Sequence, residues 1–152
     1  MSDEEREQRF FDRREAELLL PTLKDLLVAA LEKKKLVEAV EQEFSQVQNR
    51  ILLVGGILPP YGYLAEKRVE RDKLVAGIRL AVEQIEESGC VVKDLESGLL
   101  DFPSIVNDEE VFLCWKLGEE SIEWYHGLEE GFAGRKRLDA SASAPDAESK
   151  PN

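Results

Sequence analysis

The chain contains a single histidine, His126, whose imidazole suits a general base or a metal ligand near neutral pH. Carboxylates that could assist it are Asp101, Glu119 and Glu129. With further ligands supplied, His126 and Glu119 could hold iron, manganese or zinc. The alternative is a structural histidine at the end of a strand, hydrogen-bonded to a loop carbonyl. We expect this structural role, with no bound metal and no cofactor.

Two cysteines, Cys90 and Cys114, are too few for a disulfide framework. A zinc site built from both cysteines and His126 is one interpretation, although no Cys-x-x-Cys or His-x-x-x-His spacing accompanies them. Cysteine is among the residue types most often found in protein cores. We therefore expect both thiols to be buried.

Two tryptophans, Trp115 and Trp124, fall on neighbouring predicted strands with the parity of the core face. They could form a stacking platform for a ligand or peptide. The alternative is that both pack in the core against the helices. We expect core packing, because the helices need an apolar surface to cover.

The basic run Arg135-Lys136-Arg137 could clamp a phosphate or a carboxylate. For Arg135 we favour a structural ion pair, and its candidate partners are Asp94, Asp101 and Glu119. The sequence holds no complete P-loop, Gly-x-Ser-x-Gly or His-Glu-x-x-His motif. No catalytic constellation is therefore complete.

A long amphipathic helix is predicted over residues 12–50. Asp12 followed by Glu15 is typical of a helix N-cap. Apolar residues then recur at helical spacing from Leu19 to Ile51. Pro21 should kink this helix near its start or mark a new first turn after a short one.

A second helix is predicted over residues 63–87, after a Gly- and Pro-rich break, and Gly89 ends it. Two apolar stripes joined by a turn favour an antiparallel hairpin. The spacing of the apolar residues also permits a coiled coil with a partner helix or a second copy.

After Gly89 the apolar residues alternate, which predicts strands. We expect strands over residues 90–95, 99–102, 111–117 and 122–126. Turns as short as these favour antiparallel neighbours, and therefore a meander. The predicted class is α+β, with a long N-terminal helical hairpin packed on a small antiparallel β-meander of three to four strands.

The predicted organisation is a single domain between two irregular ends. Residues 1–11 are expected to be a flexible N-terminus, and residues 12–138 to form the α+β domain. Within it, residues 12–88 are the hairpin, and residues 89–138 are the meander with a closing loop. The tail, residues 139–152, is rich in Ala, Ser, Asp and Pro and should be disordered.

The composition excludes several classes of protein. The chain of 152 residues has 32 acidic and 20 basic side chains and a net charge of -12. This acidity argues against a nucleic-acid binder, which needs a basic surface. The longest apolar run, residues 51–58, is far shorter than the ~20 residues of a membrane span. With no apolar leader at the N-terminus, we expect a cytoplasmic protein.

The charge is unevenly distributed. Residues 93–130 hold eleven acidic and two basic side chains, whereas residues 131–138 hold three basic ones and no acidic one. We expect the basic run to fold back on the acidic strand region. If it does not, the sheet would present an acidic surface that favours a cation or a basic partner.

Short runs in the chain resemble the domain-of-unknown-function 2203 family, which is found mainly in bacteria. The similarity covers about residues 10–138. The runs that carry it are Phe11, Glu15-Ala16 and Leu19-Leu20-Pro21 near the start, then Gly89-Cys90, Lys93-Asp94, Gly98-Leu99, Asp101-Phe102-Pro103, Leu113 to Glu119, and Gly131 to Arg135. The resemblance implies a family and no activity that can be carried over.

We therefore expect a small non-enzymatic protein-interaction or scaffold module. Its partner would be another protein or a second copy of the chain, and neither nucleic acid nor a membrane. The alternative is an enzyme or metal-binding protein with a site around His126, Glu119 and Asp101. The candidate functional cluster is Asp101, Trp115, Glu119, Trp124, His126 and Arg135.

Overall fold

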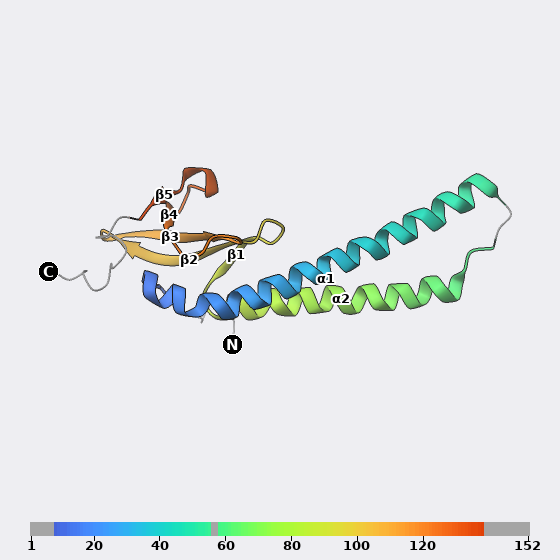
Figure 1. The fold of residues 1–152 in the computed structure, drawn as a ribbon, viewed down its shortest axis with the longest axis horizontal. Helices are drawn as coiled ribbons and strands as arrows, with labels where there is room; N and C mark the ends of the chain where they lie inside the picture. Colours follow the sequence, from blue (N-terminus) through green and yellow to red (C-terminus); the bar gives the residue numbers. More distant parts are fainter. Residues whose placement is uncertain (1–7, 56–57, 139–152) are drawn as a thin grey trace. The chain divides into compact units, whose positions relative to one another are not determined.

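The computed structural model describes residues 8–55 and 58–138. Two helices precede five strands, which confirms the α+β class and the hairpin-then-meander order. The elements are α1 (Arg13–Val54), α2 (Tyr61–Glu87), β1 (Val91–Asp94), β2 (Leu99–Val106), β3 (Glu109–Lys116), β4 (Trp124–Gly127), the 3₁₀ turn η2 (Phe132–Gly134) and β5 (Lys136–Arg137) (Figure 1).

The chain divides into two compact units, and each contains part of both helices. The sheet unit is Met1–Leu27 with Gln84–Asn152, and the hairpin unit is Val28–Glu83. Each unit is described by itself below. The predicted single domain over residues 12–138 is thus built from two compact parts.

A capping box starts α1, as the sequence predicted. Asp12 Oδ1 accepts a hydrogen bond of 2.7 Å from the Glu15 amide, and Glu15 Oε1 accepts one of 3.0 Å from the Asp12 amide. The helix then continues through Pro21 to Val54 without being divided there. Of the two alternatives for Pro21, a new first turn is therefore wrong, and a kink stays a prediction.

Phe11 belongs to the core of the sheet unit, so the prediction of a flexible segment reaching residue 11 is wrong at its end. Its amide donates to the Pro103 carbonyl at 2.7 Å, and its own carbonyl accepts from Ser104 Oγ at 2.6 Å. Its ring meets Phe102 edge-on at 5.3 Å. Residues 1–7 and the predicted disordered tail, residues 139–152, lie outside the described part of the chain.

The described residues form a five-stranded antiparallel sheet in sequence order, β1 to β5. The meander is confirmed, with the two-residue β5 as a strand that the sequence did not predict. The expected end of a strand at Pro103 is wrong, because β2 continues to Val106 and Pro103 pairs with Phe112. Asn107 and Asp108, at φ 54° and 66°, form the tight turn into β3.

The two faces of the sheet carry different side chains, because side chains alternate along each strand. One face carries Phe102 and Trp115, which meet Phe11 and the first turns of α1. The other face carries Asp101 opposite Cys114, and His126 opposite Phe112. Both faces are largely buried, and the second one holds the polar cluster described below.

In the hairpin unit, α1 and α2 run antiparallel. Lys33 lies against Gly77. Glu43 and Phe44, further along α1, contact Lys67 and Arg71, which come earlier in α2 than Gly77. These contacts place α2 alongside α1 in this unit, as the hairpin prediction requires. Within the described residues, neither helix has a stretch long and apolar enough to cross a membrane.

Substitution of Gly98 by Ala should destabilise the protein more than the same change at Gly118. Both glycines have positive φ, 71° and 109°, so each substitution strains the backbone. Only at Gly98 would the new Cβ also come within 2.6 Å of Leu117 Cβ, whereas nothing lies within 4 Å at Gly118. Urea denaturation should give a loss of roughly 2–4 kcal/mol for Gly98→Ala and roughly 1–2 kcal/mol for Gly118→Ala. Equal losses would show that the close approach of Gly98 to Leu117 is not present.

Candidate functional site

His126 and Asp101 form a buried polar pair on β4 and β2, with exposed fractions of 1% and 0%. His126 Nε2 lies 3.2 Å from both carboxyl oxygens of Asp101, and Nδ1 lies 2.9 Å from the Gly127 carbonyl. Because that carbonyl can only accept, Nδ1 carries a proton and donates it. His126 thus bonds to a backbone carbonyl at the end of its strand, but Gly127 is the last residue of β4 and not part of a loop as expected, and Asp101 is an additional carboxyl partner.

One further proton must lie between Nε2 and the Asp101 carboxyl. It sits either on the imidazole, which gives an ion pair, or on the carboxyl, which gives two neutral groups. In both forms the pair is neutral overall, and this neutrality reduces the cost of burying it. Burial raises the pKa of the Asp101 carboxyl above its usual range, and the nearby His126 opposes that shift.

Cys114 is the third member of this cluster. It lies on β3 directly opposite Asp101 and is fully buried. One ligand atom from each of Asp101, Cys114 and His126 can be chosen so that all three lie within 4.8 Å of one another. These three side chains are the set in the described part of the chain that could hold a metal ion, a subject taken up below.

Both cysteines are free and buried, as the sequence analysis expected. Burial raises the pKa of the Cys114 thiol to about 11, with the Asp101 charge acting in the same direction and Arg135 against it. Burial likewise raises the pKa of the Cys90 thiol far above its usual value. Cys90 does not join Asp101, Cys114 and His126 among the described residues, so the predicted zinc set of both cysteines with His126 forms only in part.

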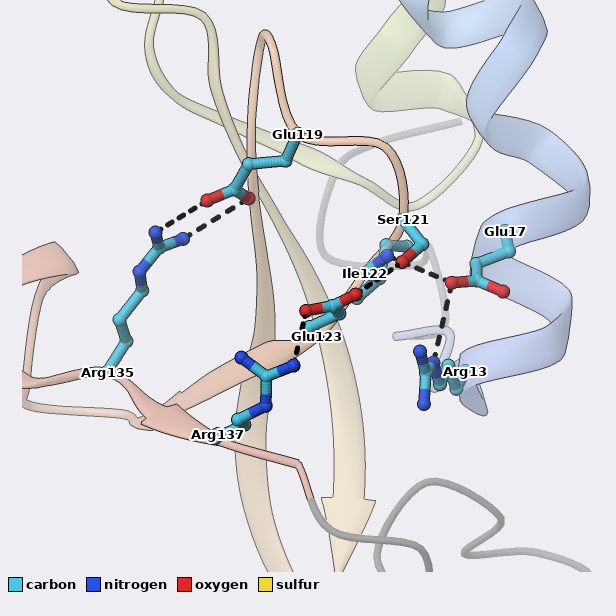
Figure 2. A network of polar contacts seen from close by, with 8 residues as sticks. All are labelled: Arg13, Glu17, Glu119, Ser121, Ile122, Glu123, Arg135 and Arg137. Carbon is cyan, nitrogen blue, oxygen red and sulfur yellow. Dashed lines mark hydrogen bonds and ion pairs between the residues drawn. The ribbon is translucent and has the colours of Figure 1, made fainter.

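Glu119 does not reach His126 but organises the loop between β3 and β4. Its carboxylate accepts two hydrogen bonds from the Arg135 guanidinium, at 2.5 and 3.3 Å, and one of 2.9 Å from the Lys116 amide (Figure 2). Arg135 thereby makes the ion pair that the sequence predicted, with Glu119 chosen from the three candidate partners. The same guanidinium lies 3.9 Å from Cys114 Sγ.

The two tryptophans lie on opposite faces of the sheet, so their predicted shared parity is wrong. Trp115 is buried on the face that meets α1, and its indole N–H donates to the Glu119 carbonyl at 3.0 Å. Trp124 is half-buried on the other face, with the guanidinium carbons of Arg135 and Arg137 at 4.7 and 5.5 Å from its ring. Core packing thus describes Trp115, while Trp124 stacks with cations of its own chain.

A second polar network joins the start of α1 to the segment just before β4 (Figure 2). Glu17 accepts from the Ile122 amide at 2.9 Å and from Arg13 at 3.4 Å. Further along the chain, Glu123 accepts from Ser121 Oγ at 3.0 Å and pairs with Arg137 at 2.9 Å. The basic run therefore does fold back on acidic side chains of the strand region.

A cavity of about 470 Å³ lies beside this network, but not at the buried cluster. Its lining residues come from α1 and from the end of β3 with the following loop: Glu17, Leu20, Pro21, Lys24, Trp115, Gly118, Glu119, Glu120 and Ser121. Of the predicted site residues, Trp115 and Glu119 line it. Asp101 and His126 have no exposed surface on which a substrate could act.

The structure thus brings Asp101 together with His126, and Glu119 together with Arg135, in two separate groups. Glu129 joins neither; its neighbour Glu130 instead accepts from the Gly127 amide at 2.8 Å. Sequence reasoning placed Cys114 with His126 only in a zinc set that also held Cys90, and it did not join Cys114 to Asp101. The available signal was the position of Cys114 on its strand. Cys114 alternates with the residues of the apolar stripe, so its side chain points to the opposite face of the sheet.

The sequence model of one family matches residues 9–138, and its description is "Uncharacterized conserved protein (DUF2203)". Comparisons with curated proteins and with solved structures gave no match. The match covers the described elements of both units, together with residues 56–57.

Substitution of Glu119 by Gln should lower the free energy of unfolding by about 1–2 kcal/mol, because it weakens a half-buried bidentate ion pair with Arg135. Glu120→Gln is the matched control, since Glu120 is the next residue in the same loop and is exposed. The control should change stability by less than about 0.5 kcal/mol in urea denaturation. A Glu119 variant as stable as the control would contradict the assigned ion pair.

Both thiols should resist modification in the folded protein. At pH 8 the reaction with a disulfide reagent should be at least about 100-fold slower than in urea, because little thiolate forms at the raised pKa and both sulfurs are buried. The folded-state pKa of Cys114 exceeds its unfolded value, so its contribution to stability is present below about pH 9 and is lost as the pH rises toward 11. One thiol reacting at the unfolded rate under native conditions would contradict the buried geometry.

Proposed function

The chain belongs to the DUF2203 family of uncharacterized conserved proteins, and we propose that it is a protein-interaction module that binds a second copy of itself through the tip of the hairpin unit. The hairpin tip is defined here by five exposed apolar residues, Leu52, Leu53, Val54, Leu58 and Tyr61. They lie at the end of α1, in the turn, and at the start of α2.

Exposure of the hairpin tip is the observation that carries the proposal. Leu53 and Leu58 are 86% and 84% exposed, and the other three tip residues are also mostly exposed. Single exposed leucines need no explanation, but a group of large apolar side chains at one place marks an interaction site. Burial of such side chains against a partner is favourable at about 25 cal/mol per Å².

The charge pattern favours a second copy at this surface. Residues 51–65 contain no charged side chain, in a chain that is 34% charged. Two acidic copies repel each other wherever their charged surfaces meet, and the hairpin tip is where that repulsion is least. The same apolar surface on both copies also permits a two-fold symmetric contact, the commonest arrangement of homo-oligomers.

A membrane surface is a poorer partner for the same tip. Peripheral attachment to anionic lipid relies on clustered Lys and Arg beside the apolar side chains. Here the chain has a net charge of -12, and the residues that follow the tip mix acidic with basic ones from Glu66 onward.

The candidate functional cluster from the sequence lies elsewhere and includes Glu119, His126 and Arg135. The geometry favours the hairpin tip instead, because His126 is buried and the other two side chains bond to each other. An enzyme built around His126 is also disfavoured, since a substrate would need access to an imidazole that is 1% exposed.

Sedimentation equilibrium of the full chain tests this proposal. We expect a reversible dimer whose dissociation constant lies below about 1 mM, the weak end of specific association. The double variant Leu53→Asp/Leu58→Asp should raise that constant at least about 100-fold, because two buried leucines contribute roughly 3 kcal/mol. The measurement is made over a range of protein concentrations.

Leu18→Asp is the matched control, since Leu18 is a 71% exposed leucine of α1 in the sheet unit. It should leave the dissociation constant unchanged. A chain that stays monomeric up to 1 mM, or a dimer that Leu18→Asp weakens as much as the tip variant does, would overturn the proposal.

A further inference from the structure

We propose that Asp101, Cys114 and His126 form a binding site for a zinc-class divalent metal ion, inside the sheet unit and independent of the hairpin tip. The ligands would be one Asp101 carboxyl oxygen, the Cys114 thiolate and His126 Nε2. This set differs from both ligand sets considered from the sequence, because it contains neither Glu119 nor Cys90.

The strand register places the three side chains on one face of the sheet. Asp101 on β2 pairs with Cys114 on β3, and His126 on β4 pairs with Phe112, two residues before Cys114. Directly opposed residues share a face, and so do residues two apart on one strand. Three neighbouring strands therefore each supply one ligand, and paired strands hold ligands more rigidly than a loop would.

The distances suit a metal of this size. Tetrahedral zinc has bonds of about 2.0–2.3 Å to oxygen, nitrogen and sulfur, so its ligand atoms stand roughly 3.3–3.8 Å apart. His126 Nε2 and the Asp101 oxygens are already 3.2 Å apart, and the three ligand atoms lie within 4.8 Å of one another. Metal binding would draw the three atoms closer together to reach that spacing.

Besides the distances, the orientation of the His126 imidazole points to a metal ligand. His126 Nδ1 donates to the Gly127 carbonyl at 2.9 Å, which fixes the ring and turns Nε2 toward Asp101. A backbone carbonyl on the outer ring nitrogen is the usual companion of a histidine that ligates a metal. The remaining lone pair of such a neutral ring is on Nε2, inside the cluster.

The charges of the set balance those of a dication. A carboxylate and a thiolate with a neutral imidazole carry two negative charges, so the loaded site is neutral in a place without solvent. Binding displaces the proton of the Cys114 thiol and the proton shared by His126 and Asp101, and both go to solvent. Arg135, 3.9 Å from Cys114 Sγ, is offset by Glu119 and can donate to the thiolate.

Cobalt(II) is the probe, because a Co–thiolate bond gives a charge-transfer band in the near ultraviolet. The full-length, untagged chain is unfolded, freed of metal with a chelator and refolded with increasing Co²⁺, since the ligands are buried in the folded protein. We expect a thiolate band that saturates at one Co²⁺ per chain and disappears on addition of Zn²⁺. The band reports a thiolate ligand, and the sequence has two cysteines that could supply one.

The variants identify the ligands. Cys114→Ala should abolish the band, and Asp101→Asn and His126→Gln should each weaken Co²⁺ binding by more than about 100-fold, since loss of an outer-shell partner alone costs 10–100-fold. Cys90→Ala is the matched control, because it removes the other buried thiol, and it should keep the band.

Circular dichroism of each variant shows whether it has folded. The proposal is overturned if the folded wild-type chain gives no thiolate band, an outcome that no variant is needed to reach. It is equally overturned if folded Cys114→Ala keeps the band, or if Cys90→Ala loses it.

Discussion

A fully buried carboxyl group, that of Asp101, sets the main constraint on the sheet unit. A carboxylate without solvent is strongly unfavourable unless it is protonated, paired or bound to a cation. Asp101 meets this requirement through His126, and His126 in turn requires the Gly127 carbonyl at its other nitrogen. These contacts hold β4 in register with β3 and β2, because a shift by one residue would turn His126 to the opposite face.

Ion pairs and hydrogen bonds of the neighbouring segments surround this pair. The Arg135–Glu119 bond closes the loop after β3, and Arg135 then lies beside Cys114 and over Trp124. Glu17 holds the Ile122 amide, which precedes β4 and ties it to α1. The buried cluster is thus bounded by polar contacts that are satisfied within the chain. Because these polar groups are paired within the chain, a strongly acidic strand region can fold around an interior carboxyl group.

The fold class and the sequence order of most elements were predictable, because hydrophobic periodicity, caps and turn residues are local signals. The capping box at Asp12 and the change from helical to alternating spacing after Gly89 are examples. For the site, the sequence could suggest single pairs, Asp101 with His126 and Glu119 with Arg135, but not how the pairs are grouped. Pro103 was expected to end a strand, yet its missing N–H is tolerated within β2, and that longer β2 sets the register of Asp101 against Cys114. Register arises from pairing between strands, which single-strand patterns do not contain.

The two proposed roles lie in different units and use opposite chemistry. The hairpin tip is exposed, uncharged and apolar, and it suits association with another chain. The Asp101–Cys114–His126 cluster is buried and polar, and it suits an ion that stabilises the fold. Neither role depends on the other, so each can fail alone.

Nitrogen-15 NMR can test directly whether His126 presents Nε2 to an interior metal site while Nδ1 donates to the Gly127 carbonyl. The single histidine gives one pair of ring resonances, with no assignment problem. With Zn²⁺ bound, the account predicts a protonated Nδ1 and an Nε2 resonance at the position of a metal-bound nitrogen. Identical ring resonances with and without Zn²⁺, or zinc on Nδ1, would contradict it.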